Sequence, residues 1–102
     1  MPNTFKNYTT ATVGTTGQVV YTVPTETTAV MIGCNIANVS SSTINVDVLI
    51  KGIHLVKNVI IPAGSAISVL DGKVILEASD TVFVESSAAE SADVIVSVLE
   101  QT

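Results

Sequence analysis

The sequence has no arginine, no tryptophan, one histidine and one cysteine, and it has few charged residues of any kind. Charged residues make up 13% of its 102 residues, whereas an average soluble protein has about 25%. Its four cations are dispersed lysines, so there is no basic stripe to neutralise phosphates and no arginine to read base edges. We therefore expect no nucleic-acid partner.

Reactive side chains are equally scarce. With His54 as the only histidine and Cys34 as the only cysteine, neither a Ser-His-Asp nor a Cys-His arrangement can be built with any redundancy, and no zinc-ligand spacing such as CxxC exists. Cys34 has the same parity as apolar neighbours, which favours a small core residue, and His54 at a strand start favours a surface or subunit contact. We predict no catalytic residues, no cofactor and no metal, and hence no enzyme.

The carboxylates outnumber the lysines by nine to four, which gives a net charge of −5. Four of them, Asp80, Glu85, Glu90 and Asp93, come late in the chain, and oxygen ligands on adjacent loops can hold Ca²⁺. No DxDxDG loop is present. We therefore interpret these carboxylates as a solvated acidic rim and keep a metal site as the alternative.

Hydrophobic residues make up 47% of the chain but do not form long runs. None approaches the roughly 18 residues of a membrane helix, and residues 1–7 lack the basic and apolar regions of a signal peptide. We therefore expect no membrane partner and a chain that starts at or near Met1. Since a single cysteine cannot form an internal disulfide, stability is expected from packing and from subunit contacts.

Valine, isoleucine and threonine together account for 40 residues, and these β-branched types favour sheets over helices. Apolar residues recur mostly at every second position in short runs separated by turn residues, which is typical of a sandwich or barrel. We predict one antiparallel β-sandwich of seven to nine strands, immunoglobulin-like or jelly-roll-like, over residues 17–102. Residues 1–16 are expected to form an N-terminal arm or an edge strand.

The alternation also predicts which side chains point inward. The inward sets are Val19, Tyr21 and Val23; Val30, Ile32, Cys34 and Ile36; and Ile44, Val46, Val48 and Ile50. Parity slips within residues 53–61, which predicts a bulge near residues 57–58. Residues 62–65 and 77–80 are predicted turns, and the Asp71-Gly72 dipeptide between two apolar runs predicts a type I′ hairpin.

The last predicted strand, residues 92–99, is apolar on both faces. Val94, Val96 and Val98 form one face, and Ile95 and Leu99 form part of the other. The outer face of a two-layer sandwich ordinarily meets water, so Ile95 and Leu99 need a cover. Either another subunit or a neighbouring loop of the same chain could provide it, and the pattern favours neither.

Eight short segments between residues 20 and 97 carry a family resemblance. They are VYTVP (20–24), TTAV (27–30), NIAN (35–38), IPAGS (61–65), LDGK (70–73), LEASDT (76–81), SSAA (86–89) and ADVIVS (92–97). In this order they resemble a recurrent small β-sandwich protein encoded by tailed bacteriophages. The chain departs from that group at Ser79, where the group often has glycine.

The resemblance implies a non-enzymatic virion structural protein that is made in the host cytoplasm. By analogy it is a capsid decoration (cement) protein, whose partners are the major capsid protein or other virion proteins and further copies of itself, a trimer being one arrangement. We predict Phe5, Tyr8, Ile95 and Leu99 as subunit or capsid contacts. The alternative is a tail, fibre or spike component that binds a host receptor or a glycan, although four aromatic residues offer few stacking platforms for sugars.

Overall fold

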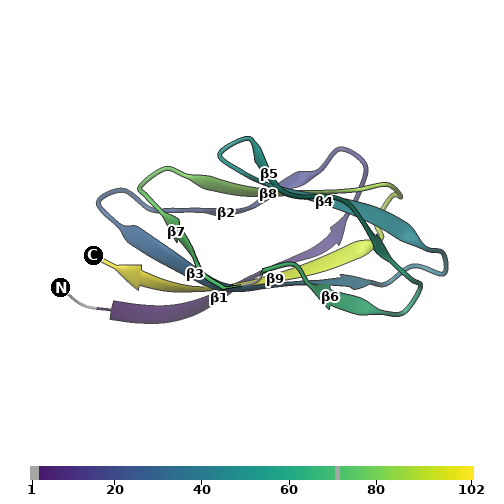
Figure 1. Cartoon of the computed structure of the whole chain (residues 1–102), viewed down its shortest axis with the longest axis horizontal. Coiled ribbons are helices and arrows are strands. Elements are labelled where there is room, and N and C mark those ends of the chain that lie inside the picture. Colours follow the sequence, from purple (N-terminus) through teal and green to yellow (C-terminus); the bar gives the residue numbers. More distant parts are fainter. Residues whose placement is uncertain (1–2, 71) are drawn as a thin grey trace.

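The computed structural model describes residues 3–70 and 72–102, and within them the chain forms nine strands joined by turns (Figure 1). The strands are β1 (Asn3–Val13), β2 (Gln18–Thr22), β3 (Thr28–Asn38), β4 (Ile44–Ile50), β5 (Ile53–Ile61), β6 (Ala66–Ser68), β7 (Val74–Leu76), β8 (Thr81–Ser86) and β9 (Ala92–Gln101). None of these residues forms a helix that is long and apolar enough to span a membrane. The expected start at Met1 lies outside the described residues.

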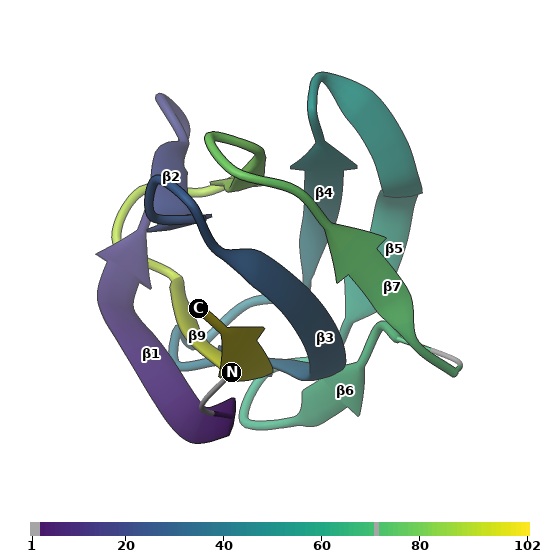
Figure 2. The ribbon, with the colours of Figure 1, turned by 90° about the vertical axis from the view of Figure 1, so that its left-hand side faces the viewer.

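The strands form two antiparallel sheets, which confirms the predicted sandwich (Figure 2). Sheet A has the order β1-β9-β3-β6, with β7 also paired to β3, and sheet B has the order β2-β8-β4-β5. The chain therefore folds as a ribbon in which β1 pairs with β9, β2 with β8, β3 with β6 and β7, and β4 with β5. The ribbon wraps so that β9 also meets β3 and β8 also meets β4. This strand order is that of a jelly roll rather than of an immunoglobulin domain.

The core lies between the inner faces of the two sheets and consists mainly of valine and isoleucine. Its largest fully buried side chains are Met31, Ile36, Ile44, Ile61 and Leu76. The predicted inward faces of β4 and β9 are confirmed, because Val46, Val48, Val94, Val96 and Val98 are all buried. Alternation holds in these two strands because neither contains an extra residue: at each register shift the extra residue lies in the partner strand.

The predicted inward position of Val19 in β2 is wrong. The pairing of β2 with β8 shifts between Val19 and Tyr21, so that Val20 and Tyr21 both point inward while Val19 is 53% exposed. A shift of one residue moves every following side chain to the other face of a sheet.

A second shift, between Met31 and Gly33 in the pairing of β3 with β9, overturns half of the prediction for β3. Cys34 and Ile36 are buried as predicted, but Ala29 and Met31 fill the core in place of Val30 and Ile32. Val30 and Ile32 therefore face outward.

The predicted bulge in β5 is confirmed. Val46 of β4 pairs with Val59 and Val48 pairs with Val56, so β5 has one extra residue in this interval. Asn58 lies in the bulge with φ +53°, a left-handed conformation that asparagine tolerates better than most residues. The turn at residues 62–65 is also present, since the Ser65 amide donates to the Pro62 carbonyl at 3.1 Å.

The predicted hairpin between residues 66–70 and 74–76 is wrong, and Asp71 of its turn lies outside the described residues. β6 and β7 do not pair with each other: β6 pairs with residues 35–37 of β3, and β7 pairs with residues 29–31. They act as one interrupted strand along the edge of β3. The eleven-residue length of β3 offers hydrogen-bond partners to both segments, and this pairing places Leu76 in the core.

Candidate functional site

Three of the four predicted contact residues lie on the outer face of sheet A, the face turned away from sheet B. Phe5 of β1 is directly opposite Leu99 of β9, and Ile95 lies on the same side of β9. Phe5 is 74% exposed, Ile95 is 43% exposed and Leu99 is half-buried. Tyr8 lies on the opposite face of β1 and is half-buried beneath the sheet.

The pairing register extends this apolar surface across the whole sheet. Leu99 also pairs with Val30 of β3, and Val30 pairs with Ile75 of β7. Phe5, Leu99, Val30 and Ile75 thus form a line across four strands, which we call the apolar row. Ile75 is 70% exposed, and Ile32 adds a further apolar side chain at 43% exposure. Side chains opposite one another on neighbouring strands have Cβ atoms about 4.5–5.5 Å apart, so the row is continuous.

Sequence reasoning missed Val30, Ile32 and Ile75 in this surface. The parity of β3 placed Val30 and Ile32 in the core because the shift near Gly33 leaves no mark in the alternation. Ile75 was assigned to a hairpin rather than to a strand beside Val30. Alternation gives no signal here, because Val74, Ile75 and Leu76 are all apolar.

A hollow of about 280 Å³ lies beside the apolar row and is lined by Phe5, Lys6, Asn7, Ile32, Ser97 and Val98. Ser97, one of its lining residues, is opposite Gly33 in the pairing of β3 with β9, so this pair of small residues adds little side-chain volume to the outer face. A Cβ atom placed on Gly33 would lie 3.6 Å from the Ser97 Cβ, which is ordinary contact. The outer face of sheet A therefore has a projecting Phe5 next to a depression.

Apart from Lys6, which lines the hollow, charge is scarce on the outer face of sheet A. Among the outward strand positions that the structure describes in this sheet, only Asp93 carries a charge. Its Oδ1 accepts a hydrogen bond from the Thr12 amide at 2.8 Å. In a protein of net charge −5, the surface that is richest in exposed apolar side chains is thus also poor in carboxylates.

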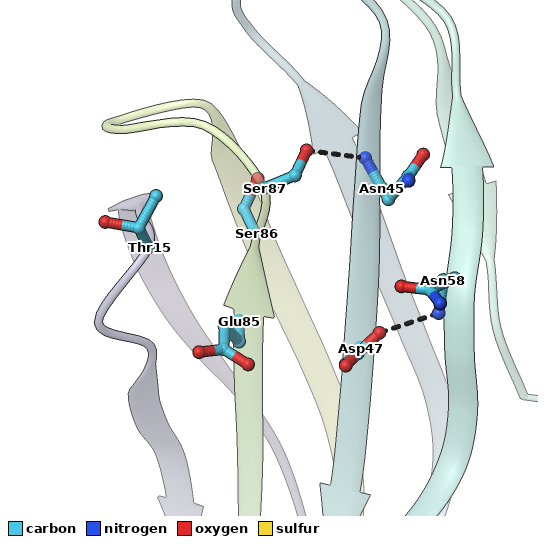
Figure 3. A pocket seen from close by; sticks show the side chains of 7 residues that line it. All are labelled: Thr15, Asn45, Asp47, Asn58, Glu85, Ser86 and Ser87. Atoms are coloured by element: carbon cyan, nitrogen blue, oxygen red, sulfur yellow. Dashed lines mark hydrogen bonds between the residues drawn. The ribbon is translucent and has the colours of Figure 1, made fainter.

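The outer face of sheet B is different, because it has a polar hollow of about 300 Å³ (Figure 3). Its lining residues are Thr15, Asn45, Asp47, Asn58, Glu85, Ser86 and Ser87. Asp47 of β4 is directly opposite Glu85 of β8, and two like charges in this position are unfavourable. The Asp47 Oδ1 accepts a hydrogen bond from the backbone amide of Asn58 at 2.6 Å, and the Asp47 Oδ2 lies 3.7 Å from the His54 Nε2.

The acidic rim predicted from the sequence is dispersed in the structure. Asp80 lies 3.7 Å from the Lys51 Nζ and accepts a hydrogen bond from the Glu77 amide. Glu85 is in the polar hollow and Asp93 is bonded to Thr12. Residues 3–70 and 72–102 contain no group of three or more His, Cys, Asp or Glu side chains placed to hold a metal ion. The pairing of Asp47 with Glu85 was not foreseen, because sequence alone does not reveal which strands are neighbours.

Cys34, which the sequence predicts as a small core residue, lies in β3 with its thiol buried. Burial raises the pKa of the Cys34 thiol to about 11, so the reactive thiolate is scarce at neutral pH.

Tyr8 belongs to a buried polar cluster at the end of the sandwich where β9 ends. The Tyr8 and Tyr21 hydroxyls both donate to the Glu100 Oε2, at 2.9 and 2.5 Å, and the Lys6 Nζ lies 3.3 Å from the Glu100 Oε1. Glu100 is 4% exposed, and the two tyrosine rings pack against each other in a tilted arrangement with their centroids 4.6 Å apart. Since Tyr21 is in sheet B and Glu100 in sheet A, the cluster ties the two sheets together.

The ionisation of this cluster follows from its geometry. Burial by itself would raise the pKa of Glu100, but the hydrogen bonds from Tyr21, Tyr8 and Lys6 and the Lys6 charge outweigh it, so the pKa is lowered. Burial, followed by the hydrogen bond to Glu100, raises the pKa of Tyr21. Glu100 is therefore a carboxylate at neutral pH, and the two hydroxyls stay protonated as its donors.

Comparison with known proteins gave no match, either to a family model or to a curated protein.

Proposed function

We propose that the chain is a non-enzymatic structural protein of a phage virion, a capsid decoration protein that binds the outside of the head and stabilises it. The observation that carries this proposal is the outer face of sheet A, where an apolar row crosses four strands and Asp93 is the one charged residue at the described outward strand positions. Exposed apolar patches of this kind mark interaction surfaces, because burying them in an assembly removes apolar area from water.

Two further features support the proposal. By analogy of fold, the jelly-roll strand order is also that of many viral capsid proteins. A surface that is buried only in the assembled particle also lowers the free energy of the assembled state, because binding stabilises whichever state it favours. A small domain with an exposed apolar face can therefore stabilise a capsid by binding to it, without any catalytic group.

The test is to find the protein on particles and to count it. An antibody raised against the purified chain should label the heads of phage particles whose genome encodes it. Immunogold electron microscopy would show the label. Gel densitometry of the same particles should give hundreds of copies. A few to some tens of copies, with label on tails or fibres, would refute decoration, and absence from particles would refute the virion role altogether.

The second candidate is a glycan- or receptor-binding module of a tail, fibre or spike. It is favoured by the polar hollow, where Asp47, Glu85 and Asn58 present carboxylates and an amide that could bond sugar hydroxyls. Jelly rolls also include lectin domains. Titration calorimetry with a panel of bacterial surface sugars tests this candidate: binding that Asp47→Asn removes would support it, and heats no larger than dilution would exclude those sugars.

A further inference from the structure

We propose that residues 3–10 of β1 are an exchangeable strand, and that the edge of β9 which they cover can instead bind residues 3–10 of a second copy of this chain. Exchange of an identical segment is domain swapping, which links copies through contacts that each copy already makes within itself. The inference goes beyond the proposed function and does not rest on it. An exchanged strand brings its Phe5 to the same place opposite Leu99, so the outer face of sheet A stays available to the particle.

Residues 3–10 add little to the core. They belong to the edge strand of sheet A, which lies at one side of the molecule (Figure 2), and they pair with residues 94–101 of β9. None of them is buried: Tyr8 and Thr10 are half-buried and the others are exposed. Segments with few buried apolar contacts and solvent-exposed backbone hydrogen bonds open at a lower free energy than the whole domain. This strand can therefore leave β9 while the core stays packed.

The boundary of the exchangeable strand lies at residues 11–12. The pairing of β1 with β9 shifts between Thr10 and Val13, so the ladder is interrupted there. Thr12 has φ +54°, a left-handed conformation that is an outlier for a β-branched residue and persists only where the surrounding structure holds it. The Asp93 Oδ1 accepts a hydrogen bond from the backbone amide of Thr12 and helps to hold this conformation. Release of the strand lets Thr12 relax, which favours a hinge at this point.

The chain beyond the hinge is fixed. Val13 is fully buried, and its carbonyl accepts a hydrogen bond from the Ser91 amide at 3.1 Å. The Gly14 carbonyl accepts two more, from the Gly17 amide at 3.2 Å and from the Ser86 amide at 3.1 Å. A strained, interrupted segment is thus followed at once by a buried anchor. This arrangement lets residues 3–10 swing out as a unit while the chain from Val13 onward stays in place.

The contacts at the edge of β9 select the occupant. The Glu100 Oε2 accepts a hydrogen bond from the Tyr8 hydroxyl at 2.9 Å, and the Glu100 Oε1 lies 3.3 Å from the Lys6 Nζ. The Ser97 Oγ donates to the Asn7 Oδ1 at 2.7 Å. These contacts read a lysine, an asparagine and a tyrosine at fixed positions along an extended strand. A second copy supplies the same three side chains in the same register.

The acceptor site stays formed when its own strand leaves. Glu100 belongs to β9 and Tyr21 to β2, so the Tyr21 hydroxyl still donates to the buried carboxylate of Glu100. A buried carboxylate without any donor would be strongly unfavourable, and this bond limits that cost in the open state. The edge of β9 is therefore ready to bind an incoming strand.

The test uses two variants of the full chain, each with one added cysteine, mixed in the presence of oxidised glutathione. Asn7 and Ser97 are opposite each other, so Asn7→Cys in one copy and Ser97→Cys in the other are held in disulfide geometry only when β1 of the first pairs with β9 of the second. We expect this crosslink to form about tenfold or more faster than one between Asn7→Cys and Ile60→Cys. Ile60 on β5 is 64% exposed and is the matched control for random collision.

The buried thiol of Cys34 separates local exchange from global unfolding. Cys34 lies in β3, so a thiol reagent modifies it when the sandwich opens. The crosslink should form faster than Cys34 is modified in the wild-type protein under the same conditions. Tyr8→Phe, added to the Ser97→Cys copy, should speed the crosslink about fivefold, because the acceptor's own strand then lacks one bond to Glu100 while the incoming strand keeps it.

A crosslink that forms no faster than the control pair, or no faster than Cys34 is modified, would overturn the inference. Thr9→Cys with Ile95→Cys is a second opposed pair and repeats the test at another position along the two strands. Absence of the crosslinked heterodimer from both pairs has the same meaning. Circular dichroism checks that every variant folds, and crosslinks above the control rate in both pairs support strand exchange.

Discussion

Replacing Tyr21 by phenylalanine tests whether the cluster around Glu100 holds the two sheets together. The change removes one hydroxyl and keeps the ring that packs against Tyr8. The lost hydrogen bond, 2.5 Å long, runs to a carboxylate that is 4% exposed, so water cannot readily replace the donor. Hydrogen bonds to charged groups contribute about 1.5–3 kcal/mol. Because Tyr8 and Lys6 still contact Glu100, we expect a loss of about 2 kcal/mol.

The assay is urea unfolding followed by circular dichroism, with thermal unfolding as a second measurement. For a domain of this size, about 2 kcal/mol corresponds to a fall in Tm of roughly 8–16 °C. Tyr8→Phe is the matched control, because its hydroxyl donates to the same oxygen at 2.9 Å from a half-buried position. It should cost less, about 1 kcal/mol. A loss below about 0.5 kcal/mol for Tyr21→Phe would refute the reasoning.

The pH dependence of this loss has a definite sign. The pKa of Glu100 is lowered in the folded protein, so its charged form adds stability above the unfolded pKa, and this contribution disappears as the pH falls through the folded pKa. Tyr21→Phe removes one of the bonds that lower this pKa. The stability difference between wild type and variant should therefore be largest at pH 7 and smaller at pH 3. A difference that grows at pH 3 would contradict the assigned role of the carboxylate.

Three further predictions concern single residues. Ser79 has φ +72°, a conformation that costs a residue with a side chain roughly 1 kcal/mol, so Ser79→Gly should raise the free energy of unfolding by about 0.5 kcal/mol in urea titrations, and a decrease would contradict the strain. Glu85→Gln relieves its repulsion with Asp47 and should stabilise by about 0.2–1 kcal/mol at low salt, with a smaller gain in high salt; equal gains in both would rule out an electrostatic origin. The Cys34 thiol should react with a thiol reagent at pH 8 only in denaturant, and rapid labelling of the native protein would show that it is accessible.

Several predictions from the sequence hold for a local reason. Ile44, Val46 and Val48 are buried because a strand without a bulge keeps a period of two, and the bulge near Asn58 disturbs parity enough to be visible. The composition, rich in β-branched residues and poor in helix formers, was sufficient to predict a sheet protein.

The errors have a different origin, because they concern pairing. Val19, Val30 and Ile32 were assigned to the core, and each lies next to a shift in register that depends on the partner strand. The hairpin at residues 66–76 was predicted from turn chemistry, but the long edge of β3 competed for both segments. The cluster of Tyr8, Tyr21 and Glu100 joins residues 79 to 92 positions apart, and no local pattern reveals it.

The scarcity of charge and the surplus of apolar residues were properties of the sequence by itself, as was the apolar character of both faces of residues 92–99. Only the tertiary structure decided where that surplus lies. Cross-strand pairing aligned Phe5, Leu99, Val30 and Ile75 from four distant segments into one row, and Asp93 is the one carboxylate at the described outward strand positions of the same face. The physical reason is that alternation is a property of a single strand, whereas a surface is made by register between strands, which the whole fold determines.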